Sequence, residues 1–223
     1  EQLALGEEEI IRNRDLENGL ISIGASENAL RLILLSELEH FCARYPHVRI
    51  RLLNYSAPQA VKALENNIID FAIVSTPVLV HKHMHQEKLV SYDEILLGGT
   101  KYKQFAQQVH YLEDISEMPL IGLCEGSSTH THYSRFFMEH NLPFEPDMEA
   151  AMTDQVLPMI THNLGIGFYP KSLALEAIEK ELVFPIELTE PLPNRDVVVI
   201  TNNHTPINSA ARRFLEFLLE NRK

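Results

Sequence analysis

Cysteine, long apolar runs and positive charge are all scarce in this chain of 223 residues. Its two cysteines, Cys42 and Cys124, lie far apart, so nothing indicates a disulfide framework. Cys42 falls within an amphipathic pattern, which predicts a packed thiol. No apolar run approaches the roughly 20 residues that a membrane-spanning helix needs. The first residues are charged and lack the hydrophobic segment of a secretory signal. These absences favour a cytoplasmic protein without a membrane partner.

The scarcity of basic residues also bears on partners. The chain has 19 Lys and Arg against 31 Asp and Glu, a formal net charge of −12. A chain this acidic is a poor binder of nucleic acid by itself, because phosphate contacts need clustered cations. Its 45% hydrophobic content is enough for the core of one large domain or two small lobes. The chain starts at Glu1 without an initiator methionine, which predicts a piece cut from a longer protein.

Residues 20–28 (Leu-Ile-Ser-Ile-Gly-Ala-Ser-Glu-Asn) set the plan of the chain. Residues 20–23 predict a short buried strand, and Gly24 and Ala25 suit a tight turn. Ser26 is a good N-cap, and Glu27 falls in the first helical turn, where the helix dipole favours negative charge. The carboxyl end of the strand therefore presents a hydroxyl and free backbone N–H groups, and such points line ligand crevices in open α/β sheets.

This alternation of strand and helix runs through the chain twice. In the first half, strands are predicted at residues 20–23, 48–53 and 70–76, with helices at 28–43 and after the capping box of Ser56 and Gln59. This β-α-β-α-β order predicts a parallel sheet. Residues 78–90 look irregular, and residues 94–98 predict a strand that crosses between lobes. In the second half, strands are predicted at residues 120–123, 148–152, 165–170, 183–188 and 197–201, with helices after Gly126, after a cap at Thr153, and at 207–219.

Four motifs together resemble a known family. They are residues 20–26 followed by Tyr45-Pro46-His47-Val48, residues 63–73 around Asp70-Phe-Ala-Ile, residues 156–170, and the last strand and helix with Ala210, Ala211 and Phe214. Each motif is loose alone, but four in register over roughly residues 15–220 are fairly specific. On these motifs the chain resembles the effector-binding domain of a LysR-type transcriptional regulator.

The resemblance implies an α/β fold of two Rossmann-like lobes joined by two crossing strands, as in type 2 periplasmic binding proteins. Lobe I would comprise residues 19–92 and 196–223, and lobe II residues 93–195. Residues 1–18 would be the remnant of a linker helix. A winged helix-turn-helix domain upstream of residue 1 would bind DNA. The resemblance also implies a small effector between the lobes, and a homodimer or tetramer. The helix at residues 28–43 is one expected contact, since Leu30, Ile33 and Leu34 widen its apolar face.

Eight residues are candidates for effector binding. Seven carry hydroxyl groups and follow predicted strands, and the resemblance adds Asn28, which with Ser26, Thr76 and residues 127–129 matches the ligand loops of the family. Capping explains any one of them, but a cap can also donate to a ligand. Helix N-termini and hydroxyls favour an anion, so we expect a small anionic effector. The candidates are Ser26, Asn28, Ser56, Thr76, Ser127, Ser128, Thr129 and Thr153.

Two histidine groups are candidate metal ligands. Alternation along an extended segment places His81, His83 and His85 on one side, and His130 and His132 form a second pair. No carboxylate or thiolate completes a recognisable spacing, so no metal or other cofactor is predicted. Imidazoles that face an effector would bind an anion or make the affinity for the effector depend on pH.

Two alternative functions remain open. A solute-binding protein of a transporter would share the fold. A cysteine hydrolase is suggested by residues 122–126, Gly-Leu-Cys-Glu-Gly, which match a nucleophile elbow centred on Cys124. Its partners would be Asp154 with His162 or His204. A short match with two glycines arises easily by chance, so a thiol in a core strand is preferred and no enzyme activity is predicted.

Overall fold

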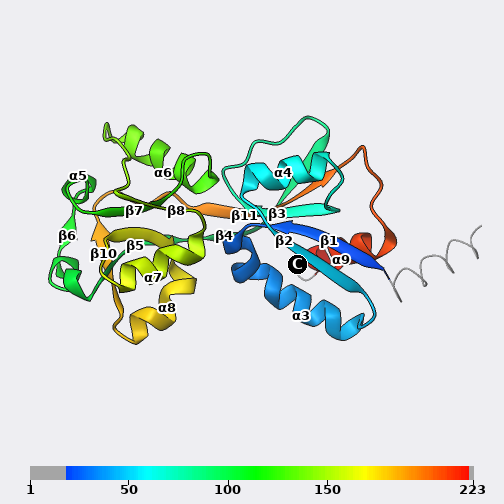
Figure 1. Cartoon of the computed structure of the whole chain (residues 1–223), viewed down its shortest axis with the longest axis horizontal. Coiled ribbons are helices and arrows are strands. Elements are labelled where there is room, and N and C mark those ends of the chain that lie inside the picture. Colours follow the sequence, from blue (N-terminus) through cyan, green and yellow to red (C-terminus); the bar gives the residue numbers. More distant parts are fainter. Residues whose placement is uncertain (1–18, 221–223) are drawn as a thin grey trace, which may run out of the picture. The chain divides into compact units, whose positions relative to one another are not determined.

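A computed structural model describes residues 19–220 (Figure 1). The predicted linker-helix remnant at residues 1–18 lies outside this range. Contacts divide the chain into two compact units. Of the described residues, unit 1 contains 19–74, 79–89 and 198–220. Unit 2 contains Ser75–Val78 and Val90–Val197. Strands β4 (Met84–Tyr92) and β11 (Arg195–Asn202) each carry the chain across a unit boundary.

The first sheet has the strand order β2-β1-β3-β11-β4. Strand β1 (Leu20–Ala25) pairs in parallel with β2 (Arg49–Asn54) and with β3 (Phe71–Ser75), which confirms the predicted parallel β-α-β-α-β arrangement. The helical connections are α2 (Glu27–Ala29), a π-helical turn at Leu30–Leu34 and α3 (Leu35–Arg44), then α4 (Ala57–Glu65). Helix α9 (Ser209–Glu220) ends the described chain.

The core of unit 1 is built on aromatic side chains. Phe41 of α3, Phe71 of β3 and Phe214 of α9 are all fully buried. The Phe214 ring stacks on Phe71, with centroids 5.8 Å apart, and meets Phe41 edge to face at 4.9 Å. Burial of large rings is a main source of stability, so these contacts hold the two helices against the sheet.

Three sequence expectations about unit 1 are wrong. Cys42 is exposed, because its neighbour Phe41 takes the inward position of the helix. Ile33 and Leu34 are buried in their own unit, whereas Leu35 is 52% exposed, so the expected apolar contact face is narrower. The π-helical turn at this point adds a residue to the turn and shifts the faces that follow it.

The third error concerns residues 78–90, which are not irregular throughout. Strand β4 lies at the edge of its sheet, and only Met84, Leu89 and Tyr92 in it are buried. A strand exposed on most positions has no period-two apolar pattern, so the sequence did not reveal it. Residues 94–98 belong to β5, which lies wholly in unit 2 and does not cross.

The second sheet has the order β6-β10-β5-β9-β7-β8. Strand β7 pairs in parallel with β8 and β9, and β5 runs antiparallel to β9 and β10. The strands are β5 (Glu94–Gly99), β6 (Val109–His110), β7 (Leu120–Leu123), β8 (Met148–Ala150), β9 (Ile166–Pro170) and β10 (Val183–Leu188).

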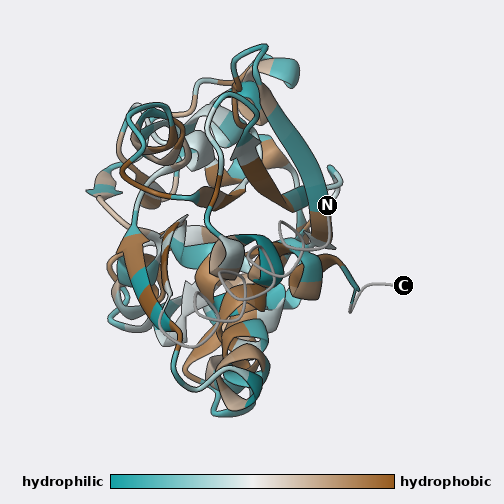
Figure 2. Cartoon of the chain, turned by 90° about the vertical axis from the view of Figure 1, so that its right-hand side faces the viewer, coloured by the Kyte–Doolittle hydropathy of each residue, from teal (hydrophilic) through white to brown (hydrophobic). Residues whose placement is uncertain are grey.

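Helices cover both faces of this second sheet. They are α5 (Leu112–Ile115), α6 (Ser128–Glu139), α7 (Val156–Thr161) and α8 (Lys171–Glu179), with 3-10 turns at Thr100–Tyr102, Phe105–Gln107 and Thr153–Gln155. Leu96 packs in the apolar cluster of α6 and its neighbour Leu97 packs with α7 and α8, because alternate side chains of a strand face opposite sides. Figure 2, which looks onto the right-hand side of Figure 1, shows both hydrophobic and hydrophilic strands, and helices of mixed colour.

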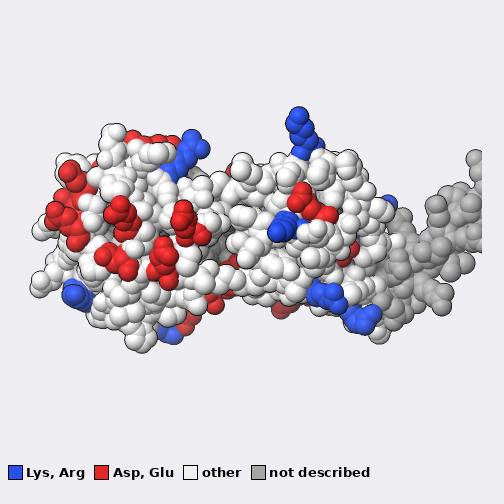
Figure 3. All heavy atoms as spheres, turned by 45° about the horizontal axis from the view of Figure 1, so that its top comes forward, with Lys and Arg blue, Asp and Glu red and all other residues white. Residues whose placement is uncertain are grey.

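Charge is distributed unevenly between the units. Unit 2 holds 17 of the 31 acidic residues but only 6 of the 19 Lys and Arg residues, so about −11 of the net charge of −12 resides there. Acidic side chains gather on unit 2 in the face that Figure 3 shows. A cation buried in unit 2 is therefore unusual for that unit. No helix within residues 19–220 is long and apolar enough to cross a membrane.

Gly99 is a packing-critical position in unit 2. A Cβ there would lie 2.3 Å from the Ile160 carbonyl oxygen and 2.6 Å from Asn163 Oδ1. Asn163 cannot retreat freely, because its Oδ1 accepts a 2.7 Å hydrogen bond from the Lys101 N–H. We expect Gly99→Ala to lower the free energy of unfolding by about 1–3 kcal/mol in urea denaturation. Gly126→Ala is the comparison, since its added Cβ meets no atom within 4 Å and only its φ of +84° is unfavourable. A smaller loss for Gly99→Ala than for Gly126→Ala would contradict this account.

Candidate functional site

A buried ion pair lies at the start of two strands of unit 2. Arg195 begins β11 and is 1% exposed, and Glu94 begins β5 and is 6% exposed. Arg195 Nη1 lies 3.2 Å from Glu94 Oε1. Isolated charges are costly to bury, so each of these groups depends on the other and on further hydrogen bonds.

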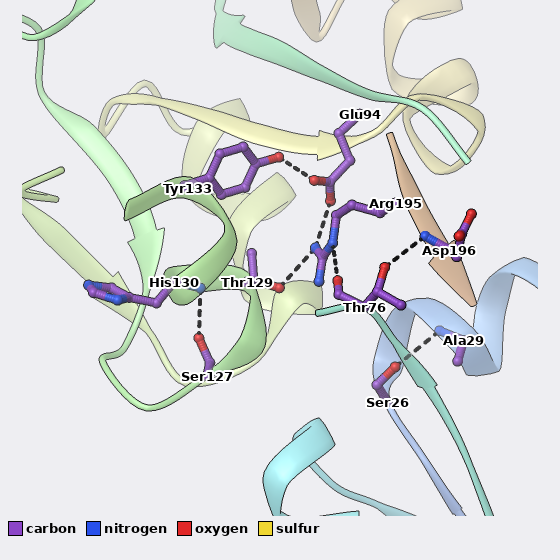
Figure 4. A network of polar contacts seen from close by, with 10 residues as sticks. All are labelled: Ser26, Ala29, Thr76, Glu94, Ser127, Thr129, His130, Tyr133, Arg195 and Asp196. Carbon is purple, nitrogen blue, oxygen red and sulfur yellow. Dashed lines mark hydrogen bonds and ion pairs between the residues drawn. The ribbon is translucent and has the colours of Figure 1, made fainter. Parts of the chain in front are cut away.

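Those further bonds come from two other segments of unit 2 (Figure 4). The Tyr133 hydroxyl of α6 donates to Glu94 Oε2. Arg195 Nη1 also donates to Thr129 Oγ1 at 3.0 Å, and Arg195 Nε donates to the Thr76 carbonyl oxygen at 2.8 Å. The network thus connects the first turn of α6, the start of β5 and the segment that follows β3.

The protonation of this network follows from its burial. Burial, and then the Glu94 carboxylate, raise the pKa of Tyr133 well above its usual value, so the phenol stays protonated. Burial would lower the pKa of Arg195, but Glu94, Tyr92 and Tyr133 together raise it. Burial, and then the Arg195 guanidinium, lower the pKa of His132 to about 4. Near neutral pH the network therefore contains one cation, Arg195, beside a neutral imidazole.

A small pocket of about 10 Å³ at the carboxyl end of β7 adjoins this network. Thr129, Thr153, Glu94 and Tyr133 all line it, together with Leu123, the last residue of β7. Two of the predicted effector-binding residues, Thr129 and Thr153, are therefore brought together. A second, open groove in unit 2 of about 500 Å³ has a ligand-sized volume. Asp93, Glu187, Glu190 and a single Lys171 line that groove, and this excess of carboxylates is unsuited to an anion.

The other predicted residues of unit 2 have defined local roles. Ser127 is the N-cap of α6, where its Oγ accepts from the His130 N–H at 3.1 Å, and Ser128 is the first residue of that helix. Thr76 Oγ1 accepts from the Asp196 N–H at 3.0 Å, which ties this segment to β11.

The predicted cap at Thr153 is wrong. Thr153 is the first residue of the 3-10 turn, and Met152 takes the capping position. The Gln155 side chain caps the turn instead: its Oε1 accepts hydrogen bonds from the N–H groups of Ala151 and Met152 at 2.9 and 3.2 Å. A long amide side chain can reach back to these donors, so the Thr153 side chain is not needed as a cap, and Thr153 lines the small pocket.

The predicted residues of unit 1 lie on two neighbouring turns. Ser26 follows β1 and Ser56 follows β2, and the Tyr55 N–H donates to the Ala25 carbonyl oxygen at 2.9 Å to join the turns. Ser26 Oγ accepts from the Ala29 N–H at 3.4 Å as an N-cap. Gln59 Oε1 accepts from the Ser56 N–H at 2.9 Å, as the capping box predicts. Asn28 is 3% exposed.

Sequence reasoning missed Arg195, Glu94 and Tyr133. The available signal was weak: Glu94 and Arg195 each stand just before a run of apolar residues, where a charged residue is commonly exposed. Nothing in their spacing of 101 residues indicates that they pair.

The histidines and Cys124 form no recognisable metal or catalytic site. His83 stacks between His81 and His204, with centroids 5.7 and 4.8 Å away, and His81 Nε2 lies 2.9 Å from Glu65 Oε1. Across residues 19–220, no group of three or more His, Cys, Asp or Glu side chains is arranged to hold a metal ion.

Cys124 is half-buried just after β7, and His162 Nδ1 lies 2.8 Å from the carbonyl oxygen of Pro158 in its own helix. His204 belongs to the other unit.

Two α/β units linked through strands β4 and β11 have the architecture of the type 2 periplasmic-binding-protein fold, a class of small-molecule binding domain. Residues 14–223 match the family model of the LysR substrate binding domain, and the chain belongs to this family. The predictions of a two-lobed α/β fold and of a LysR-type effector domain are therefore confirmed.

Relatives and solved structures agree with this assignment. The chain is 23% identical over 213 residues to the uncharacterized HTH-type transcriptional regulator YoaU of Bacillus subtilis (strain 168). That match covers 93% of this chain and 69% of the relative, so the chain spans about two thirds of the relative's length. The effector-binding domain of QuiR in complex with shikimate and the Synechocystis PCC6803 CcmR regulatory domain in complex with 2-PG each have a TM-score of 0.80 at 15% identity. Both matches cover 92% of this chain and 97% of the neighbour, and they show a common fold.

Proposed function

We propose that this chain senses a small organic anion on behalf of a longer, cytoplasmic transcriptional regulator. Thr129 and Thr153 both line one small pocket at the carboxyl end of β7, and this observation carries the proposal. The N-terminus of α6 lies at the same end of the strand, and helix N-termini favour negative charge. Shikimate and 2-PG, which the two solved neighbours bind, are both anions.

The effector contacts are assigned to the predicted residues of both units. In unit 2 these are Ser127, Ser128, Thr129 and Thr153, with Thr76 holding Arg195 through its carbonyl oxygen. In unit 1, taken by itself, the candidate contacts are Ser26, Ser56 and Asn28. Effector binding changes the arrangement of a DNA-binding domain that lies outside this chain. With a net charge of −12, the chain itself is a poor partner for DNA.

The regulator acts as a homodimer or tetramer in this proposal. Leu35, 52% exposed on α3, replaces Ile33 and Leu34 as the apolar contact of that helix, because those two side chains are already buried in unit 1. The relatives are named transcriptional regulators, which favours a regulator over a transporter component and over a hydrolase centred on Cys124. Between Cys124 and Asp154, His162 or His204 the described chain has no hydrogen bond, and a nucleophile needs a base within such reach.

Two serine substitutions test the proposed site. Native mass spectrometry of the purified chain is the first step, to identify a co-purified small molecule. Ser26→Ala and Ser128→Ala should each weaken binding of that molecule by about tenfold or more. The Ser26 change also removes a helix cap worth about 1 kcal/mol, so unfolding is measured alongside calorimetric titration.

Ser116→Ala is the matched control, because the Ser116 hydroxyl donates to the Glu113 carbonyl oxygen at the end of α5. It should leave affinity unchanged. Folded Ser26→Ala and Ser128→Ala variants that both bind the molecule as the parent does would refute the proposed site.

A further inference from the structure

Arg195 has one donor group that nothing in the described chain satisfies. Nε and Nη1 are both hydrogen-bonded, but Nη2 is buried and has no hydrogen-bond partner within residues 19–220. The side chain is 1% exposed, so the lack of a partner does not result from an exposed position. Buried donors in folded proteins are nearly always paired, and an unpaired N–H of a cation is especially costly.

The surroundings of Nη2 are fixed by unit 2. Thr76 and Thr129 hold the guanidinium from two sides, and Glu94 holds it from a third (Figure 4). The Tyr92 ring lies 5.8 Å from the guanidinium carbon and restricts it further. A donor held this firmly is pre-organised for an acceptor oxygen, because little side-chain freedom is lost on binding.

The charge balance of the network indicates which acceptor fits. Glu94 already neutralises Arg195, and His132 and Tyr133 carry no charge near neutral pH. A bound group therefore brings its own full charge into a buried place, and burial becomes steeply more costly as that charge rises. A carboxylate brings one negative charge and still forms a charge-assisted hydrogen bond, whereas a phosphate dianion brings two charges.

We propose that Arg195 is the anchor of the effector and binds a carboxylate oxygen through Nη2. This inference rests on the proposed function and adds the residue and the chemical class that the serine and threonine hydroxyls leave open. In a unit with only 6 Lys and Arg residues, Arg195 is then the cation that selects carboxylates.

The test uses shikimate as a monocarboxylate probe and inorganic phosphate, at about pH 8, as a dianion probe. Both are titrated into the whole chain with ¹⁵N-labelled arginine, and the guanidinium signals are followed by NMR. Shikimate should shift the Arg195 signals at lower concentration than phosphate does. Arg195→Lys keeps the charge but lacks the Nη2 donor, and it should bind shikimate at least about tenfold more weakly in calorimetric titration.

Arg135→Lys is the matched control, since Arg135 is the other arginine of unit 2 and forms an exposed pair with Glu139 at 2.9 Å. It should bind shikimate as the parent does. If Arg195→Lys does not fold, the NMR titration of the parent decides alone.

Arg195 signals that neither probe moves, or a folded Arg195→Lys variant with unchanged affinity, overturn the anchor. A stronger response to phosphate overturns the choice of carboxylate. Either result leaves the proposed function intact as long as the serine variants lose affinity for the co-purified molecule. If the serine variants keep the affinity of the parent while the Arg195 signals shift, the proposed serine contacts fail and the Arg195 anchor stands.

Discussion

Replacing Glu94 by alanine is expected to lower the free energy of unfolding by about 3–5 kcal/mol. Glu94 is 6% exposed and holds two partners, Arg195 Nη1 at 3.2 Å and the Tyr133 hydroxyl. The substitution leaves the guanidinium buried without its counter-ion. Small domains are stable by only about 5–15 kcal/mol, so a loss of this size is a large part of the total. Urea denaturation followed by circular dichroism measures it.

Glu139→Ala provides the matched control, because Glu139 pairs with an arginine of the same unit at 2.9 Å but on the surface. Exposed pairs contribute little, so that variant should differ from the parent by no more than about 1 kcal/mol. Replacing both buried partners by apolar groups, with Glu94→Leu and Arg195→Met, should recover part of the stability that Glu94→Ala loses. If Glu94→Ala and Glu139→Ala lower the free energy of unfolding equally, the buried pair stabilises the fold no more than the exposed pair does.

The second large effect is a loss of stability at acidic pH through His132. Burial, together with the Arg195 guanidinium, lowers its pKa from 6.5 to about 4 in the folded chain. The unfolded chain then binds the proton more tightly, so this contribution is complete above pH 6.5 and is lost as the pH falls toward 4. This single group should therefore cost about 2 kcal/mol between about pH 8 and pH 5.

His132→Gln should flatten the pH profile of stability relative to the parent over this range. The measurement is the difference between the urea midpoints of the two proteins at each pH. His162→Gln, at an exposed position of the same unit, controls for the removal of a histidine as such. If His132→Gln and the parent lose stability in parallel as the pH falls, His132 is not protonated in the way its surroundings imply.

The fold of unit 1 could be predicted in most of its elements, and the reason is local. The apolar run at residues 20–25 and the alternating residues 49–54 each predict a strand, and Ser26 and Ser56 with Gln59 begin the helices that follow. Strand β4 escaped prediction because an exposed edge strand carries no apolar period. The sequence predicts no element at residues 100–118 or at helix α8, since the turns are too short and the helical pattern is too weak.

The candidate site was predictable only in part. The sequence predicts hydroxyl groups at strand-to-helix turns, such as those of Ser26, Ser127 and Thr129, because the start of a helix depends on local chemistry. Which of them meet is a matter of sheet order: β7 lies between β8 and β9, and this brings Thr129 and Thr153 to one pocket.

The sequence by itself determined the alternation of strands and helices, the acidic character and the resemblance to the LysR effector domains, because periodicity, composition and motif spacing are properties of the chain. Only the tertiary structure decided that Arg195 and Glu94 form a buried pair, that Tyr133 and Thr129 complete it, and that Nη2 is left with no partner in the described chain. The physical reason is that a charge tolerates burial only where partners from distant segments surround it, and pairing across 101 residues leaves no local pattern to read.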